Sequence, residues 1–126
     1  MITKENILAN IEIIKVTIEN FNGLDTSGLL DYLGEVVSLQ STSTENQATA
    51  KFHLLGAINN ELDRQAKLMN NDKIAPSIKK MRADAMCREW HYIYETTERQ
   101  SRAISHTIDA VRTKISYLKQ ELNNNR

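Results

Sequence analysis

The sequence is poor in the residues that interrupt helices or build sheets and disulfide frameworks. Its 126 residues include one proline, one cysteine, four glycines and 6% aromatic residues. Proline and glycine are the residues that helix interiors tolerate least, whereas aromatic side chains are enriched in strands. A lone cysteine cannot form a disulfide within the chain. These scarcities favour an all-α protein and exclude a fold stapled by internal disulfides.

Long apolar runs are absent too. The most apolar N-terminal stretch, residues 7–21, is interrupted by polar side chains that include Asn10, Glu12 and Lys15. A secretory signal needs an unbroken apolar core of about 7–15 residues, and a membrane-spanning helix needs about 20 apolar residues. The sequence therefore predicts no signal peptide and no membrane span. We expect a reducing cytoplasm, with Cys87 as a small core residue rather than a reactive thiol.

The C-terminal part of the sequence contains a long helical pattern. Pro76 suits the first turn of a helix, and neither proline nor glycine follows it. From Cys87 onward, apolar and small residues recur at alternating steps of three and four, which is the heptad pattern of a helix packed along a partner. The spacing predicts one helix over residues 76–122, roughly 70 Å long. Its expected buried positions are Cys87, Trp90, Tyr94, Thr97, Ser101, Ile104, Ile108, Val111, Ile115, Leu118 and Leu122.

Three shorter helices are expected before residue 70. Thr3 suits the N-cap of a helix over residues 3–22, which Asn22-Gly23 would end. Residues 27–40 carry a second apolar stripe at helical spacing. Residues 41–44 contain no apolar side chain, so we expect a break there and a third helix over residues 44–70. The stripes expected to be buried are Ile7, Ile11, Ile14, Ile18 and Phe21, then Leu29, Leu30, Leu33, Val36 and Val37, then Ala48, Phe52, Leu55, Leu62, Ala66 and Met69.

These patterns predict a single all-α domain over residues 1–126 with four helices. Residues 1–42 would form an N-terminal helical pair. Residues 43–122 would form a long, coiled-coil-like antiparallel hairpin of the third and fourth helices, joined by a polar turn at residues 70–73. The last residues, 123–126, are expected to fray as a short tail.

The lengths of the expected helices also predict assembly. A third helix of about 26 residues is too short to cover a fourth helix of about 46 residues, which would leave part of an apolar stripe exposed. Soluble monomers avoid continuous exposed apolar stripes. We therefore expect a homo-oligomer built through the far half of the last helix. The predicted contacts are Ile104, Ile108, Val111, Ile115, Leu118 and Leu122.

Motifs for catalysis and metal binding are missing. There is no glycine-rich phosphate loop, no His-Glu-x-x-His motif and no cysteine pair. His91 and Glu95 lie one helical turn apart, as do His106 and Asp109, so a metal site in a helical bundle is one interpretation. The other is a charged outer helix face, which we favour because these residues lie off the heptad pattern. The sequence predicts no catalytic residue, no metal site, no cofactor and no enzymatic activity.

Charge is balanced overall but unevenly placed. Residues 1–70 hold nine acidic and five basic residues, whereas residues 71–126 hold seven acidic and eleven basic residues. Two mutually attracting faces would explain this asymmetry, and so would a basic arm for an anionic partner such as nucleic acid. Tyr92 is the best candidate for an exposed ring that stacks on a base, because Trp90 and Tyr94 fall on the heptad pattern. The candidate phosphate contacts are Lys79, Lys80, Arg82 and Arg88.

The last 35 residues or so, from Glu89-Trp90 through Asp109-Ala110-Val111-Arg112 to Lys119-Gln120-Glu121-Leu122, resemble helices of small proteins from tailed phages and prophages. Trp90 followed after a dozen residues by Ala103-Ile104 is similar to the C-terminal helix of the phage recombination-mediator family. Members of that family are helical, form rings, bind single-stranded DNA and help load a recombinase. The resemblance covers about a quarter of the chain.

The resemblance implies an oligomeric accessory protein that binds single-stranded DNA and has a recombinase as a partner. It would act in the cytoplasm of a bacterial host. The alternative is a phage-type assembly, adaptor or inhibitor module that binds only proteins, in which the charges serve solubility. The two alternatives differ in whether the basic residues near the start of the last helix contact phosphates.

Overall fold

The computed structural model describes residues 2–21, 26–69 and 75–124, and every regular element in these ranges is an α helix. The four helices of these ranges are α1 (Lys4–Glu19), α2 (Thr26–Met69), α3 (Pro76–Met86) and α4 (Arg88–Asn124). The predicted all-α class and number of helices are confirmed. Residues 123 and 124, which we expected to fray, are the last residues of α4. The expected turns at Asn22-Gly23 and at residues 70–73 lie outside the described residues.

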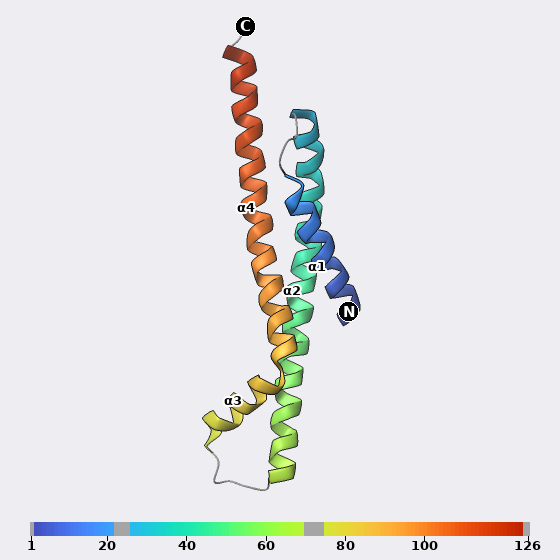
Figure 1. The fold of residues 1–126 in the computed structure, drawn as a ribbon, viewed down its shortest axis with the longest axis vertical. Coiled ribbons are helices and arrows are strands. Elements are labelled where there is room, and N and C mark those ends of the chain that lie inside the picture. Colours follow the sequence, from blue (N-terminus) through green and yellow to red (C-terminus); the bar gives the residue numbers. More distant parts are fainter. Residues whose placement is uncertain (1, 22–25, 70–74, 125–126) are drawn as a thin grey trace.

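The two long helices, α2 and α4, lie antiparallel along each other (Figure 1). They make the largest helix–helix contact of the described fold, and α3 does not take part in it. Midway along the pair, the hydroxyl oxygens of Ser43 on α2 and Ser101 on α4 lie 2.7 Å apart. The hairpin predicted between the third and fourth helices is therefore wrong, because the long hairpin is formed by α2 and α4.

Helix α1 packs against both long helices. The side-chain amide of Asn10 donates a hydrogen bond to the side-chain oxygen of Asn46 on α2, over 3.1 Å. On the other side, Gln100 of α4 donates its side-chain N–H to the backbone carbonyl of Ile11, over 2.8 Å. The start of α1 lies near the start of α4, where Lys4 pairs with Glu89. Helix α1 thus runs in the same direction as α4.

The break predicted at residues 41–44 is wrong, because α2 continues through them as one helix of 44 residues. The hydroxyl of Thr44 donates to the carbonyl of Gln40, one turn earlier in the same helix, over 2.9 Å. Ser43 is buried and contacts Ser101 of α4. These hydroxyl groups are satisfied inside the helix and across the helix pair, so tertiary packing overrides their preference for turns. Residues 26–42 are the first part of α2 rather than a separate helix.

The single helix predicted over residues 76–122 is also wrong, because Cys87 separates α3 from α4. The Cys87 backbone has φ −105° and ψ 22°, and its N–H donates to the carbonyls of Ala83 and Asp84. Helix α3 then departs from the line of α4 (Figure 1). Ala83 and Cys87 are both buried at this elbow. Neither is a helix breaker, so the bend accompanies packing that local propensity does not reveal.

Two apolar clusters hold the helices together, with a polar layer between them. The smaller cluster contains Ile7, Ala50 and Ile93, near the start of α4. The polar layer includes the buried side chains of Ser43 and Asn46. The larger cluster lies toward the opposite end of the hairpin and joins α1, α2 and α4. Its buried members are Ile14, Leu29, Tyr32, Val36, Ile104, Ile108, Val111 and Ile115.

Several side chains of α2 that we expected to be buried are exposed instead. Leu30 is 50% exposed, Val37 39%, Phe52 59% and Leu55 51%. A continuous helix of 3.6 residues per turn brings a different face of α2 against α4 and α1. That inner face is lined by Leu29, Tyr32, Val36, Ser43, Asn46, Ala50 and Leu54.

The residues predicted as an oligomer contact are placed mainly inside this chain's own core. Leu118 packs against the larger cluster, and Leu122 is 60% exposed. The reason for expecting a largely uncovered stripe on the last helix is gone, because the first part of α2 covers the stripe as far as Ile115. The four contacts that are buried against the same chain are Ile104, Ile108, Val111 and Ile115. Homo-oligomerisation itself stays a prediction.

Candidate nucleic-acid interface

A groove of about 410 Å³ lies at the elbow between α3 and α4, against the last turns of α2. Each of the three helices contributes one arginine to its lining: Arg64 from α2, Arg82 from α3 and Arg88 from α4. The arginines come together because the bend at Cys87 turns α3 out of line with α4. Guanidinium groups are the side chains best suited to bind phosphate through paired hydrogen bonds.

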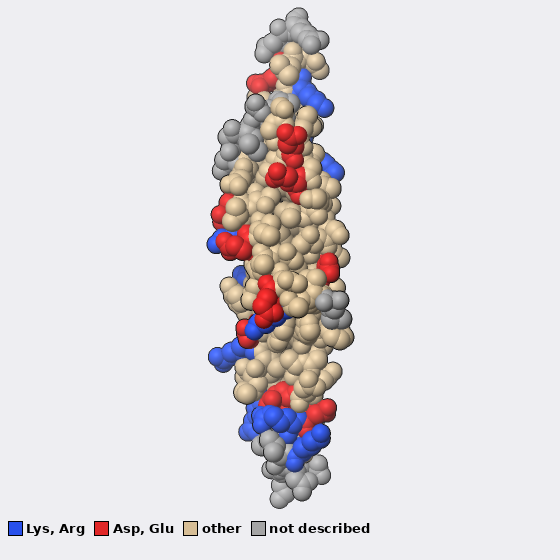
Figure 2. Space-filling view, turned by 90° about the vertical axis from the view of Figure 1, so that its right-hand side faces the viewer, with Lys and Arg blue, Asp and Glu red and all other residues tan. Residues whose placement is uncertain are grey.

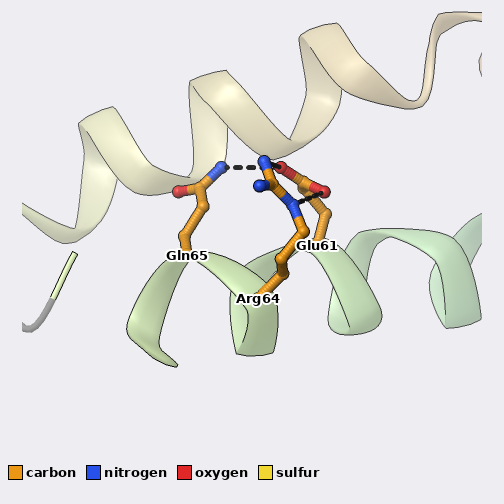
Figure 3. A network of polar contacts seen from close by, with 3 residues as sticks. All are labelled: Glu61, Arg64 and Gln65. Carbon is orange, nitrogen blue, oxygen red and sulfur yellow. Dashed lines mark hydrogen bonds and ion pairs between the residues drawn. The ribbon is translucent and has the colours of Figure 1, made fainter. Parts of the chain in front are cut away.

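One carboxylate shares this groove. Glu61 accepts hydrogen bonds from Arg64 Nε at 2.9 Å and Arg64 Nη2 at 2.5 Å, and a longer one from Gln65 Nε2 at 3.4 Å (Figure 3). The hydrogen bonds from Arg64 hold the pKa of Glu61 below its ordinary value. Glu61 is therefore ionised at neutral pH, and it offsets one of the three arginine charges.

The predicted phosphate contacts divide into two groups. Arg82 and Arg88 have exposed side chains and line the groove. Lys79 and Lys80 lie on the turn of α3 before Arg82, outside the groove lining; Lys80 is exposed and Lys79 half-buried. Sequence reasoning missed Arg64, because no local pattern reveals that the end of α2 lies beside the elbow.

Tyr92, the predicted stacking residue, is 66% exposed. It lies on α4 one turn after Arg88, at a second groove of about 300 Å³ between α1 and α4. Lys15 of α1 and Arg99 of α4 line the same groove. Arg99 donates a hydrogen bond to the hydroxyl of Thr96 over 3.4 Å, which directs it along the helix. The exposed Tyr92 ring thus lines the second groove, one helical turn after Arg88 of the first groove.

The other two aromatic residues near the start of α4 have packing roles, as the heptad pattern predicted. Trp90 stacks on His53 of α2 with 4.8 Å between ring centroids, and Lys4 of α1 lies 5.8 Å from the Trp90 ring. Trp90 and Tyr94 both pack against the smaller apolar cluster. Tyr92 is therefore the ring in this region that is most open to a ligand.

The histidine and carboxylate pairs do not converge. His91 Nε2 lies 3.4 Å from Asp84 Oδ1, across the elbow from α4 to α3. Among the described residues, no group of three or more histidine, cysteine, aspartate and glutamate side chains is arranged to hold a metal ion. Burial, with the nearby carboxylates of Glu61 and Asp84, raises the pKa of the Cys87 thiol. This disfavours the thiolate that a cysteine nucleophile needs.

Comparison with known proteins adds no relative. Neither the models of protein families, nor the curated proteins, nor the solved structures contain a match to this chain. In the ranges that the structure describes, no helix is both long and apolar enough to cross a membrane.

Proposed function

We propose that this chain is a non-enzymatic accessory protein that binds single-stranded DNA. The observation that carries the proposal is the position of Tyr92, an exposed ring with arginines before and after it on α4. We call the contact surface the basic strip, and it consists of Arg64, Arg82, Arg88, Tyr92 and Arg99. Lys79 and Lys80 extend it along α3.

The chemistry of the basic strip fits a single strand better than a duplex. Arginine side chains neutralise phosphates without regard to sequence, and an exposed ring can stack on a base that has no pairing partner. Arg88 and Tyr92 are four residues apart on one helix, which separates them by about 6 Å along its axis. A flexible strand can place a phosphate and the adjacent base over such a pair.

The resemblance of residues 89–122 to the phage recombination-mediator family points to the same class of ligand. On this proposal, the chain would coat a single strand and help a recombinase to load. Several weakly binding strips joined in one assembly would gain avidity along a flexible strand.

One titration tests the proposal. Fluorescence anisotropy with a labelled single-stranded oligonucleotide, at two salt concentrations, measures affinity and its salt dependence. We expect affinity to fall steeply as salt rises, because bound arginines release counterions. The variant with Lys79, Lys80, Arg82 and Arg88 all replaced by alanine should lose binding.

A matched control separates the basic strip from overall charge. Arg102, Arg112, Lys114 and Lys119 lie on α4 outside the two grooves to which the basic strip contributes. Replacing these four by alanine removes the same charge from the chain, and we expect most of the affinity to remain. No binding at low salt, or equal losses in both quadruple variants, would reject the proposal.

The second candidate function is a protein-binding module, and one feature favours it. Helix α3 exposes apolar side chains at Ile78 (45%), Met81 (69%) and Met86 (67%). Exposed methionines adapt to varied partner surfaces. If the titration shows no binding at low salt, this surface of α3 becomes the leading candidate site.

A further inference from the structure

Helix α2 carries a second stripe, on the side that faces away from α4. Its positions follow helical spacing and contain no charged residue, although α2 has charged residues at eight other positions. Leu62 is half-buried and the other ten positions are exposed. We call this stripe the outer seam: Leu30, Gly34, Val37, Ser41, Thr44, Ala48, Phe52, Leu55, Asn59, Leu62 and Ala66.

The outer seam is not explained by packing within the chain. A helix face that meets only water usually carries charged side chains. The large apolar side chains that the described part of α2 exposes, Leu30, Val37, Phe52 and Leu55, are all members of the seam. Figure 2 views the molecule from the side of α1 and α2, and much of the middle of that face, where α1 lies over α2, is free of charged side chains. Such a face marks a docking site for another helix.

The order of residues in the outer seam indicates what docks there. Counted outward from Ala48, the spacing is 4, 3, 4, 3 and 4 residues in both directions. In an antiparallel pair of identical helices centred on Ala48, seam positions therefore meet seam positions. The pairs are Leu30 with Ala66, Gly34 with Leu62, Val37 with Asn59, Ser41 with Leu55, Thr44 with Phe52, and Ala48 with its own copy.

These pairs fit one another by size. Leu30, Leu62, Leu55 and Phe52 each meet a residue that is smaller: alanine, glycine, serine or threonine. Alternation of large and small side chains across facing positions is what lets two helices interdigitate. We infer that the outer seam is the interface of an antiparallel homodimer, with its two-fold axis beside Ala48.

Gly34 fits this interface, although Gly56, outside the seam, is equally open within the chain. A side-chain carbon added at Gly34 would have no atom within 4 Å, so packing inside the chain does not require a glycine there. Glycine in the middle of a helix costs about 1 kcal/mol relative to alanine. In the dimer, Gly34 lies opposite Leu62 of the second copy and provides the space for that side chain.

The area of the seam is sufficient for a stable pair. From Leu30 to Ala66 the seam spans about 54 Å, and a helix is about 12 Å wide with its side chains. The strip would bury about 650 Å² on each copy, or about 1,300 Å² in total. Specific protein–protein interfaces bury about 1,200–2,000 Å² in total. The dimer does not depend on the proposed DNA binding.

The axis beside Ala48 makes the test sharp, because an exposed residue there meets its own copy. We expect the unaltered chain to have twice its monomer mass of 14.4 kDa in light scattering at tens of micromolar. Ala48→Lys and Ala48→Glu should each be monomeric, since each brings two like charges together. An equimolar mixture of the two variants should recover the dimer mass. Far-UV circular dichroism checks that each variant keeps its helix content.

Cysteine cross-linking then tests the direction of the pair. Ser41→Cys mixed with Leu55→Cys should give a disulfide between the two variants, whereas each variant alone should not cross-link. The unaltered chain, whose Cys87 is buried, measures the background. A parallel pair would give the opposite result, with each variant cross-linking to itself. Self-cross-linking of each cysteine variant would overturn the inference. So would a monomer mass for the unaltered chain, or a dimer mass for both Ala48→Lys and Ala48→Glu when each is measured alone.

Discussion

Ser43 and Ser101 share a hydrogen bond of 2.7 Å between their hydroxyl oxygens, in the middle of the contact between α2 and α4. Ser101 also donates to Gln47 Oε1 over 3.0 Å. Because Ser101 has only one hydroxyl proton and gives it to Gln47, the proton between the two serines belongs to Ser43. This chain of hydrogen bonds specifies which turn of α4 faces which turn of α2.

We expect Ser101→Ala to lower the free energy of unfolding by about 1–3 kcal/mol, because it leaves the buried hydroxyl of Ser43 without its acceptor. Ser105→Ala, an exposed position one turn further along α4, should change stability by less than about 0.5 kcal/mol. Urea denaturation measures both. In the variant with both Ser43 and Ser101 replaced by alanine, the loss should be smaller than the sum of the single losses. Strict additivity would contradict the hydrogen-bond assignment.

Tyr92→Ala should weaken binding to a single-stranded oligonucleotide by about 5- to 150-fold, which corresponds to a stacking contribution of about 1–3 kcal/mol. Tyr117→Ala is the matched control, because Tyr117 is also on α4 and is 59% exposed. We expect no loss of affinity for that variant. Anisotropy titrations at one fixed salt concentration compare the two. Equal affinities of the two variants would show that the Tyr92 ring is not a contact.

Glu61→Gln should strengthen binding of the same oligonucleotide by up to roughly fivefold, because it removes the carboxylate that offsets Arg64 in the groove. Asp63→Asn makes the same change of charge at an exposed position of α2 outside the groove. Its effect should be smaller. If the two variants bind equally, only overall charge matters and the groove is not the site.

The environment of Tyr32 predicts that the free energy of unfolding falls at alkaline pH. The one hydroxyl proton of Tyr32 is shared between the carbonyls of Thr17 at 2.7 Å and Ile18 at 3.2 Å, in the last turn of α1. Burial raises the pKa of Tyr32, and the charge of Glu35 adds to the effect. The pKa of Tyr32 is therefore higher in the folded state than in the unfolded state. The stability that the protonated hydroxyl contributes is complete below the ordinary tyrosine pKa of roughly 10, and it is lost as pH rises through the folded-state pKa.

The variant that tests this is Tyr32→Phe. We expect it to lower the free energy of unfolding by about 0.5–1.5 kcal/mol at neutral pH and to reduce the loss of stability on going to alkaline pH. Urea denaturation at pH 7 and at about pH 11 gives both values. Tyr117→Phe, at an exposed position, serves as the control. An alkaline loss that is unchanged in Tyr32→Phe would assign it to other groups.

The heptad spacing of the last helix, which is the most regular apolar pattern in the sequence, correctly predicted which of its residues are buried. Ile104, Ile108, Val111 and Ile115 are buried as their spacing predicted, because a regular apolar stripe on an otherwise polar helix has only one face to bury. The spacing did not identify the surface that covers these residues, because the hydrophobic effect is non-directional and any apolar surface can bury them. A second copy and the first part of α2 satisfy the same stripe equally well.

Helix α2 shows where apolar spacing alone fails. It carries one stripe around Leu29 and Val36 and another around Val37 and Phe52, and spacing cannot say which stripe faces the same chain. The inner stripe continues through Ser43 and Asn46, which are polar, and Ser43 lies in the break that was predicted at residues 41–44. The bend at Cys87 has no local signal, so the meeting of Arg64 with Arg82 could be found only from the fold.

The hydrogen bond from Gln100 to Ile11 joins residues 89 positions apart in the chain. During synthesis, the apolar face of α1 leaves the ribosome long before α4, one of the two helices that pack against it. At translation rates of about 5–20 residues per second, that delay lasts about 4–18 seconds. In that interval α1 is available to chaperones, or to the exposed apolar face of another nascent chain. Folding of this small bundle is therefore completed only after α4 has been made.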